Sequence, residues 1–556
     1  MSPPATTISL PSRFAAEVLE RNLAGLDRGD PSLAARLRLP VDASRVSFDA
    51  DGRAFYRLHE ARLPLDIEPR ALEEDLAHLA GASAVTVLGL GLGEGLDAAL
   101  ASPAARIEAW DRDPWLVRLC LMRRDYRREL AAGRLRLRLG SDLLALEGAA
   151  GARLVHPLLG RIYARELAFL ARPAATEAVA LGAGELFVDQ LGRAFARRGL
   201  APWTLDIERL AREELDLTMR RLRPRLVVAV NYTAGLAEFC RAHGVPLLCW
   251  EVDPSLSPPR PPASAADHVF VFTHRRANVA AYARAGFPHV EYLPLAADPE
   301  IRAESGTRQE ERPHPLTFVG ASLVENAGAL QGKFVAEWER WRGGAPGAAA
   351  EALAALRDIL AAQRLRPEEF VLPALLEARA AGFRAFAGEA PGGVDPVLLA
   401  AEVAAAEKRL AYLANLGALG VRVWGDPGWE LVTRHGVRYM GRAGHEQELT
   451  AVYGASRVNL DVGRLYQNDI VTMRVFDVLS CGAFLLAEHS TALEEVFAVG
   501  AEVASYRTVA ELRAKARYYL DHPREAAEIA RRGRDAVHAR HTIAQRLDHM
   551  LAAMGA

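Results

Sequence analysis

The stretch VTVLGLGLGEGLDAAL, residues 85–100, joins a short apolar run to a glycine-rich turn and then to a helix-like segment. A short apolar run that ends at glycine is typical of a buried strand, and glycine permits a tight turn into a helix. Further apolar runs follow at RIEAWDR (106–112) and RLRLRLG (134–140). Strands that alternate with helices in this way predict an α/β fold with a parallel sheet.

The same alternation continues through the rest of the chain. With 556 residues, the chain is too long for one hydrophobic core. A second set of strands includes RLVVAVN (225–231), PLLCWEVDP (246–254) and HVFVFTH (268–274). A third set starts at LTFVGAS (316–322) and is interrupted by an Ala-rich helical region at about 330–416. The sequence therefore predicts several α/β domains and a helical insertion.

Composition restricts the classes of partner and the compartment. The chain has 68 Lys and Arg against 70 Asp and Glu, so broad binding to nucleic acid or to an acidic membrane surface is not expected. The 4 cysteines are scattered, which favours reduced thiols. No run approaches the roughly 20 apolar residues of a membrane span, and no leader-like segment is evident. We therefore expect a cytoplasmic protein without an integral membrane segment.

The glycines of the opening stretch are candidates for a ligand loop. Gly89, Gly91 and Gly93 alternate in a G-x-G-x-G-x-G pattern, which differs from the dinucleotide pattern G-x-G-x-x-G. Asp111 lies near the end of the next strand, and Asp142 follows the third. In these features residues 80–165 resemble class I S-adenosylmethionine methyltransferases, which implies that these five residues form an S-adenosylmethionine-like loop. The alternative is that the glycines only allow a strand and a helix to pack closely.

A second candidate site lies in NDIVTMRVFDVLSCGAFLLAE, residues 468–488. Asp469 and Asp477 have seven residues between them, and Arg474 lies inside that interval. Together with WEVDPSLSPP (250–259), LTFVGA and RVNLDVGR, this segment resembles GT-B glycosyltransferases of the CgeB-like (spore maturation protein) type. The order and spacing of these motifs match over about residues 180–550.

The resemblance implies a domain plan and an activity. The expected fold is α/β, with two GT-B Rossmann-like lobes, an additional N-terminal Rossmann-like domain and a helical insertion. The expected domains are an appendage (1–75), a methyltransferase-like domain (76–170), an acceptor lobe (175–305), a donor lobe (313–540) with the insertion, and a C-terminal helix (541–556). The implied reaction moves a sugar from a nucleoside diphosphate to a hydroxyl of a protein or glycan acceptor, with retention of configuration.

The diphosphate of such a donor explains the donor-side candidates. Arginines, backbone N–H groups and helix N-termini can neutralise its charge without a metal, so no metal and no cofactor are expected. Arg474 is the candidate phosphate contact, Asp477 the ribose contact and Asp469 the catalytic group near the sugar. Related enzymes carry Glu at both acidic positions, and Asp469 is alternatively a helix cap. The remaining donor-binding candidates are Gly320, Trp424, Arg442, Asn468 and Gly482.

Several of these candidates have structural alternatives. Trp424 is alternatively a core residue, Arg442 a solvated one and Gly482 a helix C-cap. On the acceptor side, Glu251 and Asp253 end a buried strand at i and i+2, so both are expected on one face, where one acts as general base. His274 is another candidate base, or else a hydrogen-bonded loop residue.

Two rival functions stay open at this point. One is an S-adenosylmethionine-dependent methyltransferase, alone or combined with the glycosyltransferase. The other is a non-catalytic scaffold with decayed Rossmann domains, which the two Asp-for-Glu replacements favour.

Overall fold

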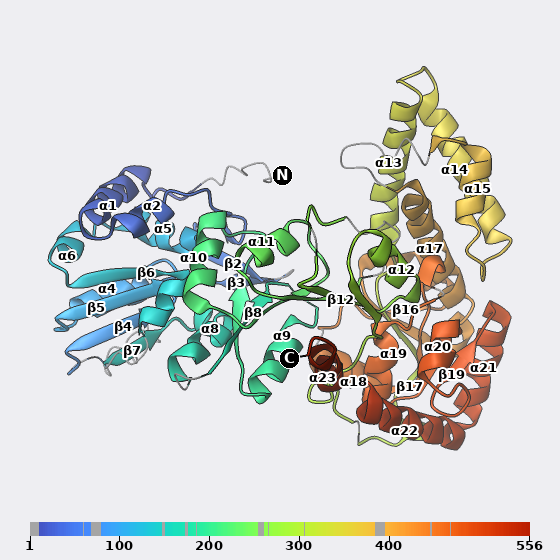
Figure 1. Ribbon diagram of the computed structural model, residues 1–556. Coiled ribbons are helices and arrows are strands. Elements are labelled where there is room, and N and C mark those ends of the chain that lie inside the picture. Colours follow the sequence, from blue (N-terminus) through green and yellow to red (C-terminus); the bar gives the residue numbers. More distant parts are fainter. Residues whose placement is uncertain are drawn as a thin grey trace. The chain divides into compact units, whose positions relative to one another are not determined.

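The protein is described by a computed structural model (Figure 1). The described residues are 10–58, 61–67, 79, 81–146, 151–172, 176–184, 186–253, 261–264, 266–304, 306–383, 395–444, 447–467 and 469–555. Within them the chain forms two compact units. Unit 1 comprises residues 1–230 and 236–248, and unit 2 comprises 231–235 and 249–556.

Unit 1 begins with α1 (Ala16–Gly29), α2 (Pro31–Arg36) and a small antiparallel sheet. The sheet has the order β1 (Val46–Phe48), β2 (Ala54–Leu58), β3 (Ala61–Pro64). Gly52, with φ +77°, lies in the turn of the hairpin that β1 and β2 form.

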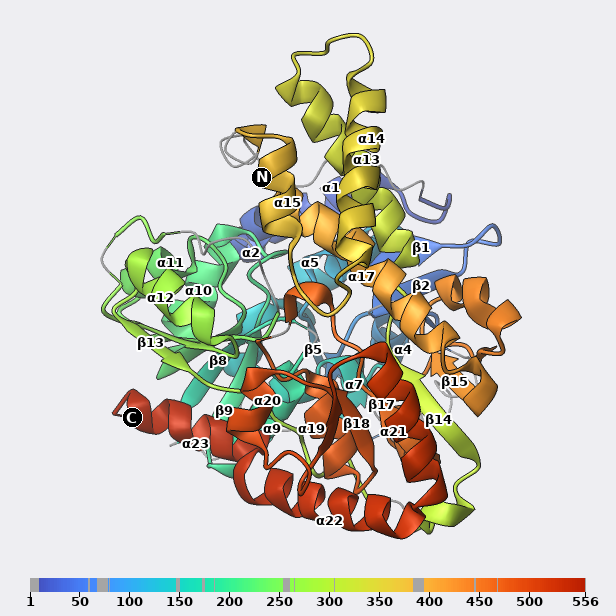
Figure 2. The same ribbon diagram turned by 90° about the vertical axis from the view of Figure 1, so that its right-hand side faces the viewer.

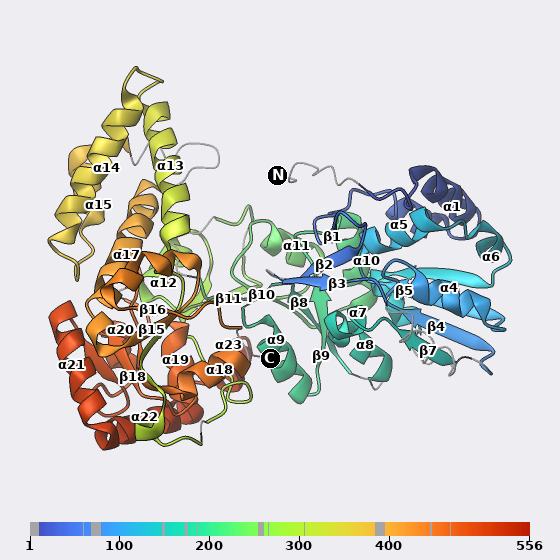
Figure 3. The same cartoon turned by 180° about the vertical axis from the view of Figure 1, so that it is seen from behind.

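The opening stretch of the sequence forms β4 (Ala84–Leu88), the glycine turn and α4 (Glu94–Ala101). β4 lies inside a four-stranded sheet with the order β6 (Leu135–Leu139), β5 (Arg106–Asp111), β4, β7 (Ala152–Val155). Every pairing in this sheet is parallel, as predicted. Its helices include α5 (Pro114–Arg123) and α6 (Arg127–Ala131), and short helices α7 (Leu159–Ile162) and α8 (Ala164–Ala168) follow β7 (Figure 3).

A six-stranded sheet contains the second set of strands. Its order is β13 (His289–Tyr292), β12 (Val269–Thr273), β11 (Leu247–Glu251), β10 (Leu226–Val230), β8 (Ala178–Gly182), β9 (Ala201–Leu205). β10, β8 and β9 pair in parallel, as do β12 and β13. The helices of this region are α9 (Val188–Arg197), α10 (Arg212–Leu222), α11 (Leu236–Ala242) and α12 (Arg276–Arg284).

Unit 2 contains a second six-stranded sheet, and all of its pairings are parallel. Its order is β16 (Arg438–Tyr439), β15 (Val421–Trp424), β14 (His314–Val319), β17 (Ser456–Leu460), β18 (Leu485–Glu488), β19 (Ala504–Tyr506). The helices after β16 are α18 (Gln447–Gly454), α19 (Met473–Ser480), α20 (Thr491–Val496), α21 (Val509–Asp521), α22 (Pro523–Arg540) and α23 (Ile543–Ala553). The last five, α19 to α23, are labelled in Figure 2.

The predicted helical insertion lies between β14 and β15. It consists of α13 (Val324–Trp341), α14 (Ala348–Arg364), α15 (Leu372–Arg379) and α17 (Pro396–Ala414), so it starts a few residues earlier than expected. These helices share a buried apolar core of their own, separate from the core of the β14–β19 sheet. In Figure 1, α13, α14 and α15 extend away from that sheet.

Threonine side chains cap the starts of two C-terminal helices. Thr542 and Gln545 form a complete capping box at the start of α23. At α21, Thr508 caps the backbone N–H of Glu511, but the Glu511 carboxylate accepts from Arg507 N and not from the cap residue.

All four cysteines are buried and free. No helix in the described part of the chain has the length and apolarity to cross a bilayer.

Candidate functional site

The glycine loop after β4 is packed against side chains of its own unit. A Cβ at Gly89 would lie 2.9 Å from Leu159 Cβ, and one at Gly91 would lie 2.5 Å from His156 Nε2. A Cβ at Gly93 would lie 2.8 Å from Cys120 Sγ. The three glycines therefore allow close internal packing, which is the alternative stated from the sequence.

The two acidic residues of this region are also bonded internally. Asp111 is fully buried and accepts from Leu90 N (2.7 Å) and from the Tyr163 hydroxyl (2.8 Å). Burial raises the pKa of Asp111 to about 7. Asp142 accepts from Arg36 Nη1 at 2.9 Å and also from Arg221. The acceptor oxygens expected to bind S-adenosylmethionine thus bind donors from the chain itself.

Glu251 and Asp253 have different partners. Glu251 is buried at the end of β11, where it accepts from Asn278 Nδ2 (2.9 Å), the Tyr282 hydroxyl (3.0 Å) and Thr273 Oγ1. Asp253 is exposed and accepts from Asn231 Nδ2 at 2.7 Å. The prediction of a shared face is wrong because β11 ends at Glu251, so strand alternation does not extend to Asp253.

His274 and Asp469, both predicted as catalytic groups, lie near each other around Arg275. His274 is buried, its Nδ1 lies 3.1 Å from the Glu251 carbonyl oxygen, and its Nε2 has no hydrogen-bond partner among the described residues. Burial, together with the charge of Arg275, lowers the pKa of His274 to about 4, whereas the hydrogen bond to the Glu251 carbonyl oxygen and the charge of Asp469 oppose the shift. Asp469 Oδ2 accepts from Arg275 Nε at 2.8 Å, and its Oδ1 is buried without a partner in the described chain. Buried polar atoms without partners are rare and point to a ligand or an ordered water.

Arg474 and Gly320 meet at the carboxyl end of β14. Arg474, on α19, donates from Nε to the Val319 carbonyl oxygen at 2.8 Å and pairs with Asp461. Its guanidinium lies 4.6 Å from the centroid of the Phe318 ring. A Cβ at Gly320 would lie only 2.7 Å from Arg474 Nη2. The absence of a side chain at Gly320 therefore allows this arginine to lie against the strand end.

Asp477 and Gly482 belong to the same helix and its end. Asp477 is buried and accepts from Arg302 Nη2 at 2.9 Å. Gly482 has φ +63°, and its N–H donates to Leu479 O at 2.9 Å. The next N–H, of Ala483, donates to Val478 O at 3.2 Å, which completes a Schellman motif. Gly482 thus has the structural role of a helix C-cap.

The remaining donor-side candidates are Trp424, Arg442 and Asn468. Trp424 ends β15 with 7% of its surface exposed, and its ring centroid lies 5.4 Å from that of His314. This burial matches the alternative of a core residue. Arg442 is exposed in the segment after β16. Asn468 lies outside the described residues.

Three charged residues of α17 also reach this region, and the sequence analysis missed them. Arg409 is buried and donates to the carbonyl oxygens of Ala321 (2.7 Å) and Val462 (3.2 Å), which follow β14 and β17. Lys408 pairs with Glu488, and Glu402 lies 3.2 Å from Arg464 Nε. The available signal was the presence of four charged residues, Glu402, Glu407, Lys408 and Arg409, in an otherwise apolar, Ala-rich helix, where Glu402 and Arg409, at i and i+7, lie on one face.

The electrostatics of this cluster favour an anion. Arg474 pairs with Asp461 and Arg464 with Glu402, whereas the hydrogen bonds of Arg409 within the described chain go to carbonyl oxygens. Burial, followed by Arg474 and Arg464, lowers the pKa of Arg409 to about 9. The cluster lies at the carboxyl ends of parallel strands, where α/β proteins bind ligands. The fold and the site therefore define an α/β protein with a candidate anion-binding site.

One family model matches part of unit 2. Residues 405–552 match the family model described as "Glycosyl transferase-like". This match identifies a glycosyltransferase domain, and it includes Arg409, Asp461 and Arg474. No curated protein matches the chain.

Several solved glycosyltransferase structures are similar to part of the chain. Sucrose-phosphate synthase from Thermosynechococcus elongatus has 12% identity over 68% of this chain and 97% of its own, with a TM-score of 0.40. HepE of Anabaena, solved with UDP-glucose, has 12% identity over 68% of this chain and 99% of its own, with a TM-score of 0.39. AviGT4, a glycosyltransferase involved in avilamycin A biosynthesis, has 15% identity with the same two coverages and a TM-score of 0.38.

Proposed function

We propose that the protein transfers a sugar from a nucleoside diphosphate donor to a hydroxyl of a protein or glycan acceptor. The observation that carries this proposal is the position of Arg409. It is a buried cation beside Arg464 and Arg474, and its hydrogen bonds in the described chain go to carbonyl oxygens. A buried charge needs a counter-charge, and a diphosphate at the ends of β14 and β17 supplies one.

The same cluster suits the chemistry of a departing diphosphate. Negative charge grows on the leaving group as the bond to the sugar breaks, and fixed guanidinium groups stabilise that charge without reorganisation. We assign this role to Arg474 and Arg409, and we propose that the reaction proceeds without a bound metal.

The sugar is assigned to the neighbourhood of His274 and Asp469. Each has a buried polar atom without a partner in the described chain, His274 Nε2 and Asp469 Oδ1, and sugar hydroxyls can bond to both. Because the imidazole is neutral above about pH 5, His274 acts in this proposal as a hydrogen-bonding group and not as a cation. Asp477 remains our candidate for the ribose hydroxyls, and retention of configuration is part of the proposal.

A ligand screen tests the proposal. The purified full-length protein is heated with UDP, GDP, dTDP, CDP or S-adenosylmethionine, because a ligand that binds the native state raises the melting temperature. We expect one nucleoside diphosphate to raise it, and the Arg474→Ala variant to lose that increase while it remains folded. An equal increase in Arg474→Ala would overturn the site assignment. A response to S-adenosylmethionine alone would favour the methyltransferase, and no response to any of the five would favour the scaffold.

A further inference from the structure

The loop between β17 and α19 contains Arg464 and Asp469. Part of this loop packs against the helices of the insertion, α13, α14, α15 and α17. We infer that Glu402 and Lys408 of α17 are positioning residues that hold this loop in the shape needed to bind the donor. The inference rests on the proposed function. It gives the insertion a role in the donor site, whereas an insertion of this kind is otherwise a natural candidate for binding an acceptor.

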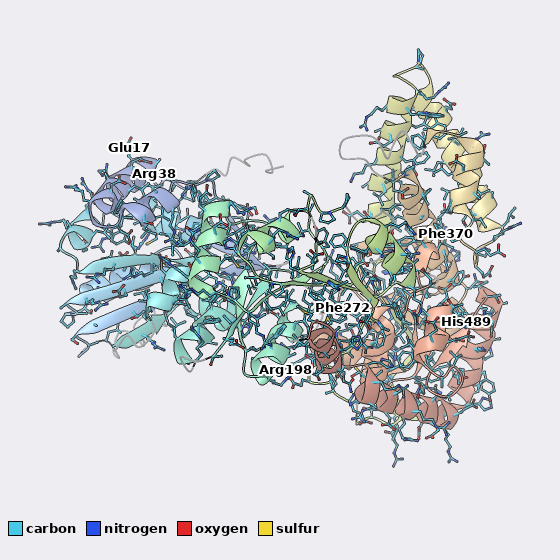
Figure 4. All side chains as sticks on the ribbon, in the orientation of Figure 1. Glu17, Arg38, Arg198, Phe272, Phe370 and His489 are labelled. Atoms are coloured by element: carbon cyan, nitrogen blue, oxygen red, sulfur yellow. The ribbon has the colours of Figure 1, made fainter. Side chains whose placement is uncertain are left out.

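The apolar part of the loop is buried among the insertion helices. Leu465 and Tyr466, in the short helix Leu465–Gln467, are 4% and 2% exposed and belong to the buried core of α13, α14, α15 and α17. The Tyr466 ring lies 6.4 Å from that of Phe370, which precedes α15 and is labelled in Figure 4. The loop therefore cannot move without disturbing the core of the insertion.

The polar contacts of α17 fix both ends of the same loop. At one end, Lys408 pairs with Glu488, whose Oε2 accepts from Gly463 N at 2.9 Å. At the other end, Glu402 accepts from the Tyr466 hydroxyl and lies 3.2 Å from Arg464 Nε. The hydrogen bonds that Gly463 N donates to Glu488 and the Tyr466 hydroxyl donates to Glu402 are directional, so they set the orientation of the loop as well as its position.

The position of the loop also affects residues that we assign to the donor site. Arg275 donates to the Tyr466 carbonyl oxygen at 3.2 Å and to Asp469 Oδ2 at 2.8 Å. A shift of Tyr466 therefore shifts Arg275 and Asp469, and loss of Glu402 also removes the counter-charge of Arg464. A misplacement of about 1 Å in a catalytic site can reduce the rate by roughly 100-fold.

The test compares two substitutions on one helix. Glu402→Gln keeps the size of the side chain and removes its charge. Glu407→Gln is the matched control, because Glu407 lies on the same helix and pairs with Arg364 of α14 at an exposed position. We expect Glu402→Gln and Lys408→Met each to raise the KM for the nucleotide sugar by roughly 10-fold or more and to lower kcat, whereas Glu407→Gln leaves both unchanged. Melting temperatures verify that the variants are folded.

A second measurement needs no donor. Amide hydrogen exchange at residues 463–467 reports whether the loop is held, and we expect faster exchange in Glu402→Gln than in Glu407→Gln. Equal exchange and equal kinetics in these two variants would overturn the inference. If exchange differs but the wild type binds no nucleoside diphosphate, the loop is anchored as described and it is the proposed function that fails.

Discussion

At the scale of single residues, Gly320 determines how closely Arg474 can approach the end of β14. In Gly320→Ala, the new methyl group would lie 2.7 Å from Arg474 Nη2 and 3.2 Å from the Phe318 ring, so the guanidinium must move. We expect nucleoside diphosphate affinity to fall about 10-fold, which corresponds to about 1.4 kcal/mol. Calorimetric titration measures the change.

Gly332→Ala is the control for that substitution. Gly332 lies in α13, and nothing lies within 4 Å of a Cβ at this position. Alanine in a helix interior is more stable than glycine by roughly 1 kcal/mol, so this variant should be as stable as the wild type or more stable, with unchanged affinity. Equal affinity in both variants would show that Arg474 does not contact the ligand.

His274 makes a pH-dependent contribution to stability. Its folded pKa of about 4 lies below the ordinary value of 6.5 because it is buried. Above about pH 6.5, His274 is neutral in both the folded and the unfolded chain, so it does not make the free energy of unfolding depend on pH. As the pH falls from 6.5 towards 4, the unfolded chain binds a proton that the folded chain does not, so stability decreases. We expect this decrease to be smaller in His274→Gln than in the wild type.

Urea unfolding between pH 4 and pH 7 tests that expectation. The control is His435→Gln, because His435 is exposed. An identical pH profile for His274→Gln and the wild type would contradict the buried, neutral state of His274.

At the scale of elements, α23 illustrates how a local sequence signal stabilises a long-range contact. Its capping box joins Thr542 and Gln545 through bonds of 3.3 Å and 2.8 Å. Beside the cap, Thr542 pairs with Ala297 in a parallel bridge, and Arg546 donates to the Pro294 carbonyl oxygen at 2.7 Å. The helix cap thus lies where α23 contacts the segment that follows β13.

We therefore expect Thr542→Ala to lower the free energy of unfolding of unit 2 by about 1 kcal/mol, a typical cost for loss of an N-cap. Thermal unfolding measures it. Thr508→Ala removes a cap without the second bond of the box, so its effect should be smaller. The reverse order would show that the bridge to Ala297 does not depend on the cap.

At the scale of the whole molecule, unit 1 depends on a buried charge network that joins distant parts of the sequence. Arg36 of α2 bonds to Asp142 after β6 at 2.9 Å and to Glu214 Oε2 of α10 at 2.9 Å. Arg221 pairs with the same Asp142. Arg36 and Asp142 are therefore part of the packing of unit 1, and a deletion of residues 1–165 would remove the Arg36 partner of Glu214.

Removal of one cation tests this network. Arg36→Met leaves two buried carboxylates without that partner, and we expect unit 1 to lose about 3–5 kcal/mol of stability. Arg38→Met is the control, because the Arg38–Asp27 pair is exposed and screened by solvent, so its loss should change the stability little. Chemical denaturation monitored by hydrogen exchange in unit 1 distinguishes the two, and equal losses would contradict a buried network.

The sequence by itself determined the parallel sheets, the hairpin at Gly52, the helical insertion and the presence of Arg474 and Asp477 on one helix. These features follow from local periodicity, turn residues and the geometry of a helix, which act over a few residues. Tertiary structure alone decided that His156 fills the space beside Gly91, that Arg275 binds Asp469 194 positions away, and that Arg409 of the insertion joins the loops after β14 and β17. Such contacts depend on which strand ends become neighbours in a sheet, and no pattern within a single segment carries that information.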